Sequence, residues 1–164
     1  MVAFSAGSMS YSALDQRSNS VAQLLMWIGL AHGDGIAIML ENDLEYFELV
    51  WGARRHGVYY TPVSTHLKAD KASYIVRDSG AKLLFTTERF SDSVKALLAE
   101  NPSRCMVFVL RGGIAGCLDY HSELKRFDRY LEVPDGPVGK DLFYSSGTTG
   151  KPKGIKQPLF ASIA

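Results

Sequence analysis

Apolar positions follow two different periods along the chain, and the two periods alternate from one segment to the next. Within residues 11–33, four apolar residues are spaced i, i+3, i+4 and i+7, which lines one face of a helix. They are Val21, Leu24, Leu25 and Ile28. The run GIAIML at 35–40 is short and continuously apolar, which is typical of a strand buried on both faces. The first two predicted elements are therefore a helix and a buried strand.

The same alternation continues to residue 110. Helices are expected over 43–56, 68–80 and 91–102, and strands over 58–63, 81–87 and 104–110. Strands that alternate with helices through short links imply a mostly parallel sheet with helices on both faces, which is an α/β fold. After residue 110 we expect a loop, a short helix within 119–127, a connector over 132–141 and another buried strand from 142.

Polar residues and glycines suggest where the first two helices begin and end. Ser12 and Asp15 resemble a capping box, and Gly33 is a suitable end for the first helix. Asn42 is expected to cap the second helix and Gly57 to end it.

Composition narrows the class of protein. The chain has 164 residues, of which 46% are hydrophobic and 21% charged, with a net charge of +1. A net charge this small gives no overall positive potential that would attract nucleic acid or an acidic membrane. Cys105 and Cys117 lack partners at zinc-like spacing and fit a reducing cytoplasm. The N-terminus has no signal-peptide pattern, and the longest apolar stretch is too short to span a bilayer.

Several residues that could carry chemistry have simpler interpretations. Glu45 and Glu48 are three apart on a helix, so a solvated face is favoured over an acid–base pair. Trp27 and Trp51 lie in apolar helical patterns and are interpreted as core or interface. Asp78 is at a helix end, where structural hydrogen bonding is the usual role. The four histidines are scattered, so no metal site is expected.

The most informative stretch is YSSGTTGKPKG at 144–154, which leaves the end of an expected strand. Glycines let the backbone approach a ligand closely, and the surrounding amides can form an anion-binding nest. Hydroxyls donate hydrogen bonds, and lysines make charge-assisted bonds to phosphate. Because ligands of open α/β sheets bind beyond the carboxyl ends of the strands, we expect this loop to lie there and to hold a polyphosphate. The contributing residues are Ser145, Ser146, Gly147, Thr148, Thr149, Gly150, Gly154, Lys151, Lys153 and Lys156.

The loop differs from a Walker loop. Gly150 and Lys151 are followed by Pro152 where the Walker pattern has Ser or Thr, and proline disfavours a helix that grows straight from the loop. The alternative interpretation is a plain surface hairpin whose glycines serve only the turn. A turn needs neither four hydroxyls nor three glycines in this order, so a flap over a triphosphate is favoured.

The string YSSGTTGKPKG resembles the phosphate-binding signature of the adenylate-forming ligases, which include acyl-CoA synthetases, luciferases and peptide-synthetase adenylation domains. The segments SYSALDQRSNSVAQLL, GDGIAIMLENDLEYFELVWGARRHGVYYTPV and DSGAKLLFTT are similar to the N-terminal half of an acyl-CoA synthetase. GIKQPL, after the loop, is similar to a subset of acyl-CoA ligases. Other members have a His-Asn pair there that this sequence lacks, which leaves the substrate subgroup open.

The resemblance implies a two-step reaction that uses ATP, Mg²⁺ and coenzyme A. A carboxylate attacks the α-phosphate of ATP and releases pyrophosphate, and the thiol of coenzyme A then displaces AMP. By the same resemblance, Ser145, Ser146, Thr148 and Thr149 hold the β- and γ-phosphates, Gly147 and Gly150 allow close backbone approach, and Lys153 faces the phosphates. Lys151 is at a variable position, and Tyr144 has a packing role. The family's catalytic residues, metal ligand and acyl pocket lie further along, so none is assigned here.

The resemblance also implies that residues 1–164 are one partial domain, from the large N-terminal domain of an adenylate-forming ligase. Residues 1–33 would hold a helix that packs on a downstream subdomain, 34–140 the βα repeats, and 141–158 a strand with the phosphate-binding loop. We expect the N-terminal fragment of a cytoplasmic fatty-acid (or similar acid)–CoA ligase, inactive by itself and able to self-associate through surface that the missing parts would cover. Two alternatives stay open. One is a family member with another acyl acceptor, and the other is a stand-alone α/β nucleotide- or protein-binding module without catalysis.

Overall fold

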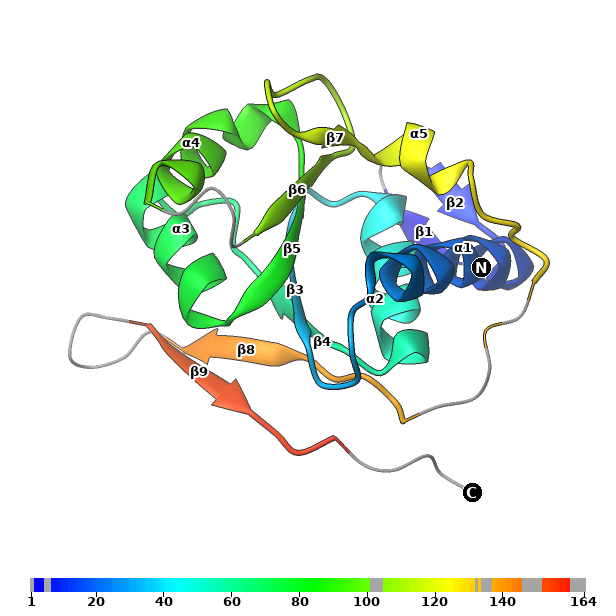
Figure 1. Cartoon of the computed structure of the whole chain (residues 1–164). Coiled ribbons are helices and arrows are strands. Elements are labelled where there is room, and N and C mark those ends of the chain that lie inside the picture. The colour runs from blue at the N-terminus through cyan, green and yellow to red at the C-terminus, as the bar shows by residue number, and fades with distance from the viewer. Residues whose placement is uncertain are drawn as a thin grey trace.

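A five-stranded parallel sheet forms the centre of the protein, in the order β4-β3-β5-β6-β7 (Figure 1). The computed structural model describes residues 2–4, 7–100, 105–131, 133, 137–145 and 152–159. The strands of this sheet are β3 (Gly35–Met39), β4 (Tyr59–Pro62), β5 (Ala81–Thr86), β6 (Met106–Val109) and β7 (Leu118–Asp119). Every neighbouring pair runs parallel, which confirms the predicted α/β class.

Helices cover both faces of this sheet (Figure 1). One face carries α1 (Tyr11–Ile28), α2 (Leu44–His56) and α5 (Tyr120–Leu124), and the other carries α3 (Ala69–Asp78) and α4 (Ser91–Glu100), which follows the short 3-10 turn η1 (Glu88–Phe90). In β3, Ile36 and Ile38 join the core beneath α1 and α2, whereas Ala37 and Met39 join the core beneath α3 and α4. Burial on both faces is why the strands are continuous apolar runs in the sequence.

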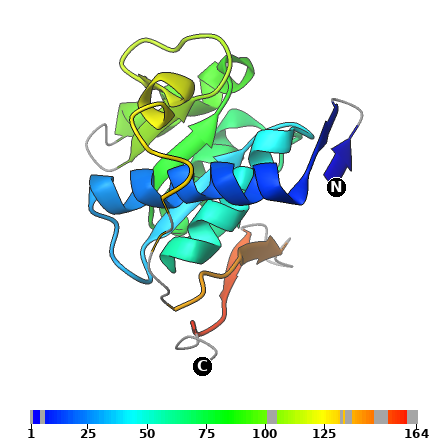
Figure 2. The ribbon, with the colours of Figure 1, turned by 90° about the vertical axis from the view of Figure 1, so that its right-hand side faces the viewer.

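The two helices α1 and α2 pack against each other over a glycine. A Cβ atom built on Gly52 would lie 2.3 Å from Cγ1 of Val21, so only glycine allows this approach. Arg55 strengthens the contact by donating to Asn19 at 3.0 Å and pairing with Asp15. Figure 2 shows α1 running across this face of the body. From the family resemblance we expected the helix of residues 1–33 to pack on a downstream subdomain. In this chain α1 packs on α2.

Three helix boundaries differ from the sequence predictions. The N-cap of α1 is Ser10, whose Oγ accepts from the amide of Ala13 at 3.1 Å, rather than Ser12. Gly29 ends α1 with φ +87°, so the chain leaves the helix before it reaches Gly33. At α2 the N-cap is Asp43 rather than Asn42, and its carboxylate pairs with Arg111 instead of capping the helix. The predicted end of α2 at Gly57, with φ +78°, is confirmed.

Two antiparallel hairpins lie outside the main sheet. The strands β1 (Val2–Phe4) and β2 (Gly7–Met9) pair at the N-terminal end of α1 (Figure 2). The strands β8 (Leu142–Ser145) and β9 (Lys153–Lys156) form the second hairpin. The connector to β8 passes close to α2 and β4. There Gly139 donates to the carbonyl of Arg54 at 2.9 Å, and a Cβ on Gly139 would lie 2.3 Å from the carbonyl oxygen of Val58.

Candidate functional site

The predicted phosphate-binding segment connects β8 to β9 in the sequence. Ser145 and Lys153 are paired residues at the end of this hairpin, and both are exposed. The structure therefore brings together these two predicted site residues. The predicted residues Ser146, Gly147, Thr148, Thr149 and Gly150, together with Lys151, lie outside the described residues.

The strand that leads into this segment is not the buried strand that the sequence predicted. In β8, Leu142 is buried, but Phe143 keeps 54% of its surface exposed. The reason is that Asp141, just before β8, forms an isolated parallel bridge with Tyr60 of the main sheet, whereas β8 itself pairs with β9. The apolar run LFYSS thus belongs to an outer hairpin.

The hairpin lies at the amino ends of the parallel strands, not at the carboxyl ends that we expected. Its contacts are to Tyr59, the first residue of β4, and to Asp78, which precedes β5. The hydroxyl of Tyr59 donates to the carbonyl of Gln157 at 2.6 Å, and Nζ of Lys156 lies 4.3 Å from the centroid of the Tyr59 ring. The expectation failed because the loop leaves the carboxyl end of its own strand β8, which is not a strand of that sheet.

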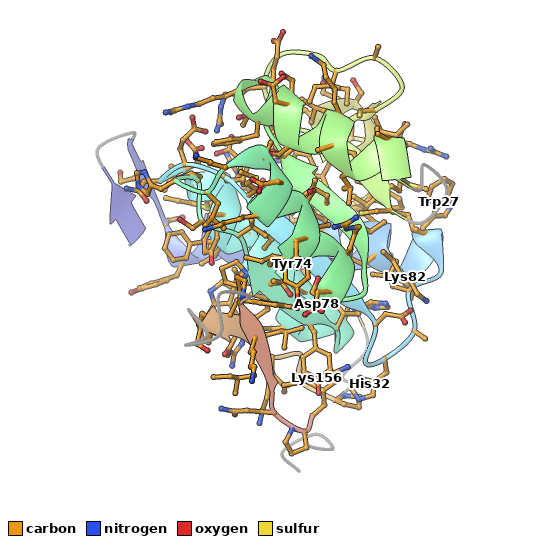
Figure 3. All side chains as sticks on the ribbon, turned by 90° about the vertical axis from the view of Figure 1, so that its left-hand side faces the viewer. Trp27, His32, Tyr74, Asp78, Lys82 and Lys156 are labelled. Carbon is orange, nitrogen blue, oxygen red and sulfur yellow. The ribbon has the colours of Figure 1, made fainter. Side chains whose placement is uncertain are left out.

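A carboxylate at the end of α3 anchors the hairpin. The hydroxyl of Tyr144 donates to Oδ2 of Asp78 at 2.7 Å, and the hydroxyl of Tyr74 donates to Oδ1 at 3.2 Å. Figure 3 shows Tyr74 and Asp78 together at this end of α3. Burial, and then the bond to Asp78, raise the pKa of Tyr144, so its hydroxyl stays a neutral donor. The structural role predicted for Asp78 is confirmed, and Tyr144 adds a polar anchor to its packing role.

Glycine on the opposite strand leaves room for this anchor. Gly154 pairs with Tyr144, and a Cβ on Gly154 would lie 3.1 Å from Cζ of the Tyr144 ring. The ring therefore covers the glycine, and its hydroxyl extends beyond the hairpin to α3. This glycine serves the packing of the hairpin in addition to any role in the loop.

A second group of polar residues, around Glu48, was not predicted from the sequence. Glu48 was predicted to face solvent with Glu45, but it is 2% exposed and accepts from the hydroxyl of Tyr120 at 2.9 Å. Burial raises its pKa to about 7, while the bond from Tyr120 and the charge of Arg17 oppose that shift. The signal was present in the sequence, because Glu48 is four residues before Gly52 and so shares its buried side of α2.

The described residues contain neither a cluster suited to a metal ion nor a helix suited to a membrane. Among them, no group of three His, Cys, Asp or Glu side chains is arranged to hold a metal ion. No described helix is both long enough and apolar enough to cross a membrane.

Comparison with known proteins gives a consistent result. The profile of the AMP-binding enzymes matches residues 1–159. A fatty acid–[acyl-carrier-protein] ligase, ScoC, from Streptomyces coeruleorubidus is 33% identical over 147 residues, which cover 90% of this chain and 27% of ScoC. A long-chain-fatty-acid–CoA ligase, FadD13, from Mycobacterium tuberculosis is 28% identical over 152 residues, which cover 90% of this chain and 29% of FadD13. The chain thus spans between a quarter and a third of the length of these relatives.

Solved structures agree with the sequence relatives. The anthranilate CoA ligase AuaEII, crystallised with anthranoyl-AMP, superimposes with a TM-score of 0.77 at 25% identity, covering 90% of this chain and 29% of that one. The inhibitor-bound N-terminal domain of FACL13 from Mycobacterium tuberculosis superimposes with a TM-score of 0.72 at 25% identity, covering 93% of this chain and 37% of that domain.

Proposed function

Because the chain belongs to the AMP-binding enzyme family of adenylate-forming ligases, we propose that it is the N-terminal part of an enzyme that activates a carboxylic acid with ATP. In the first step a carboxylate oxygen bonds to the α-phosphorus of ATP, the α–β anhydride bond breaks, and pyrophosphate leaves. In the second step a thiol sulfur bonds to the acyl carbon and loses its proton, and AMP leaves. Catalysis of such a reaction is mainly positioning and neutralisation of charge.

The observation that carries this proposal is the hairpin end formed by Ser145 and Lys153. These two residues face each other where the chain enters and leaves the glycine- and hydroxyl-rich string. We propose that the hydroxyls of Ser145, Ser146, Thr148 and Thr149 bind the β- and γ-phosphates, that Gly147 and Gly150 allow close backbone approach, and that Lys153 supplies the cation. We propose that Mg²⁺ enters the site bound to the phosphates of the nucleotide.

For the acyl group and its acceptor we propose a fatty or similar apolar acid and coenzyme A. FadD13, a long-chain-fatty-acid–CoA ligase, supports this choice. A carrier-protein thiol is the second candidate acceptor, because ScoC is an acyl-carrier-protein ligase. Cys105 and Cys117 are both free thiols, which supports the cytoplasmic location that we propose.

Binding of Mg-ATP to the 164-residue chain tests the loop. Replacing Lys153 with Ala should weaken binding by about tenfold, because a hydrogen bond to a charged group contributes roughly 1.5–3 kcal/mol. Isothermal titration calorimetry measures the change. Lys95→Ala is the matched control, since Lys95 is an exposed α4 residue paired with Asp92 on the far side of α3 from the hairpin. Equal affinities for the wild type and for Lys153→Ala would refute the proposed role of Lys153.

A further inference from the structure

A buried carboxylate lies at the edge of a cavity on the α1–α2–α5 face. The side chain of Glu48 is 3% exposed, with one oxygen bonded by Tyr120 and the other 3.7 Å from Nη1 of Arg17. Tyr120 is fully buried, so its hydroxyl holds the Glu48 carboxylate in place from the core. Burying a carboxylate is costly unless it is paired, and here the pairing holds the half-exposed guanidinium of Arg17 at the cavity.

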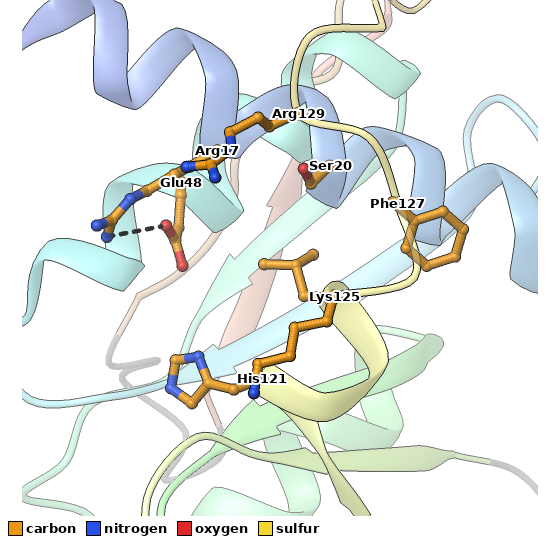
Figure 4. Close-up of a pocket in the computed structure, with 8 residues that line it drawn as sticks. Arg17, Ser20, Glu48, His121, Lys125, Phe127 and Arg129 are labelled. Atoms are coloured by element: carbon orange, nitrogen blue, oxygen red, sulfur yellow. Dashed lines mark ion pairs between the residues drawn. The ribbon is translucent and has the colours of Figure 1, made fainter.

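Three of the eight residues that line the cavity next to Glu48 are cations. The cavity has a volume of about 450 Å³, which is within the range of small-molecule sites. Arg17 comes from α1, His121 from α5, and Lys125 and Arg129 from the chain that follows α5 (Figure 4). The three full cations outnumber the single carboxylate by two even when His121 is neutral.

Two of these cations form no ion pair with a described carboxylate, although the charges of His121 and Lys125, after the bond from Ser122, help to lower the pKa of Asp119. Arg129 lies 5.5 Å from the ring centroid of Tyr130, and no ion pair joins Lys125 or Arg129 to a described carboxylate. The neighbouring Arg126 is different, because it pairs with Glu123 at 2.8 Å. A positive excess that no ion pair neutralises favours an anionic ligand.

The cavity and the β8–β9 hairpin lie at opposite ends of the sheet. His121 follows β7 by two residues, and Glu48 is in the second turn of the helix that follows β3, so the cavity is on the carboxyl-end side. The hairpin contacts Tyr59 and Asp78 at the amino ends.

We propose that this cavity is a second, separate binding site for a small phosphorylated molecule. Its phosphate would bind between Arg17, Lys125 and Arg129, with Arg17 oriented by Glu48. A phosphate dianion balances the positive excess of the lining, and arginine binds phosphate oxygens with a two-pronged hydrogen-bond geometry. The apolar walls Leu124 and Phe127 would contact the organic part of the ligand.

Inorganic pyrophosphate without Mg²⁺ is the probe, titrated into the 164-residue chain by calorimetry. Replacing Lys125 and Arg129 with Ala together should weaken binding at least tenfold, measured in the Lys153→Ala background so that pyrophosphate held by the hairpin contributes little. Both cavity residues are exposed, so this variant should keep the fold, which circular dichroism checks.

Lys71→Ala with Lys95→Ala removes the same number of charges from α3 and α4, on the other face of the sheet, and serves as the control. Two results would overturn the proposal. They are no detectable binding in the Lys153→Ala background, and an equal loss in the control and the cavity variant.

Discussion

Glu48 makes the folded state sensitive to pH. Its pKa is raised from 4.5 to about 7, chiefly by burial, with a smaller contribution from the neighbouring Glu45. Below pH 4.5 the group is protonated in both the folded and unfolded chain, so it has no effect. Between pH 4.5 and 7 the unfolded chain loses the proton while the folded chain keeps it, so stability falls as pH rises. Above pH 7 the loss is complete and on the order of 3 kcal/mol.

Replacing Glu48 with Gln should remove this dependence. Between pH 4.5 and 7.5 we expect the free energy of unfolding of the wild type to fall by roughly 3 kcal/mol relative to that of Glu48→Gln, because glutamine has no proton to lose. Urea unfolding at several pH values measures the difference. Glu123→Gln removes a carboxylate from a surface ion pair and should give a curve parallel to the wild type. Parallel curves for Glu48→Gln as well would show that Glu48 titrates normally.

Glu48 also shows why the burial of a single polar side chain is hard to predict from the sequence. Its neighbours Leu49 and Ala53 reveal the buried side of α2, but a carboxylate on the edge of that side is ordinarily assigned to solvent. Its burial depends on Tyr120, which is 72 residues away in sequence. No local pattern identifies a partner at that separation.

At the scale of elements, the β8–β9 hairpin is held to the body by a few specific contacts. The bond from Tyr144 to Asp78 holds one end, and the contacts of Tyr59 with Lys156 and Gln157 hold the other. The segment proposed to bind phosphate is therefore carried on a ribbon whose position depends on individual hydroxyl groups.

Tyr144→Phe tests that dependence. Losing the hydroxyl removes a hydrogen bond to a carboxylate, which contributes about 1.5 kcal/mol, so β8 and β9 amides should exchange hydrogen roughly tenfold faster. Mass spectrometry of exchanged peptides measures this. Tyr74→Phe is the matched control, because the bond from Tyr74 to Asp78 lies within α3 and does not reach the hairpin. Unchanged exchange in Tyr144→Phe would show that packing alone holds the ribbon.

The elements were predicted unequally well for a physical reason. The four strands β3 to β6 and the helices between them were predicted because burial on one or two faces imposes a period on their residues. The two-residue strand β7 and the exposed strand β9 have no such period. LFYSS is as apolar as a core strand, and only its pairing with β9 shows that it lies outside the sheet.

At the scale of the whole molecule, one sheet separates two cores. On β5, the adjacent residues Leu84 and Phe85 are buried on opposite faces. Phe85 stacks on Phe108 at 5.1 Å between ring centroids, on the α1–α2 side. Trp27 and Trp51 are in α1 and α2, so tryptophan fluorescence reports on that side alone.

Because Leu84 lies in the core on the α3–α4 side, Leu84→Ala tests whether the two cores unfold together. Truncating a buried leucine should lower the free energy of unfolding by roughly 2–5 kcal/mol. Since both cores share the sheet, we expect the fluorescence and far-ultraviolet circular dichroism transitions in urea to shift together. A fluorescence midpoint that stays at the wild-type value while the dichroism midpoint falls would mean that the faces unfold separately.

The overall class was predictable from the sequence, whereas the location of the candidate site was not. Alternation of strands and helices suffices for a parallel sheet with two covered faces. Placing the loop required knowing that β8 leaves the sheet at Asp141 and runs to Asp78, which depends on contacts between distant segments.

Gly139 restricts which sequences can build this arrangement. The backbone there fits between the carbonyls of Ala53 and Val58, with no space for a methyl group. Any side chain would push the connector outward and stretch the bond from the amide of Tyr60 to the carbonyl of Lys140, which sets where β8 begins. The position of the hairpin that we propose to bind nucleotide therefore depends on the lack of a side chain at Gly139, which lies outside the proposed site.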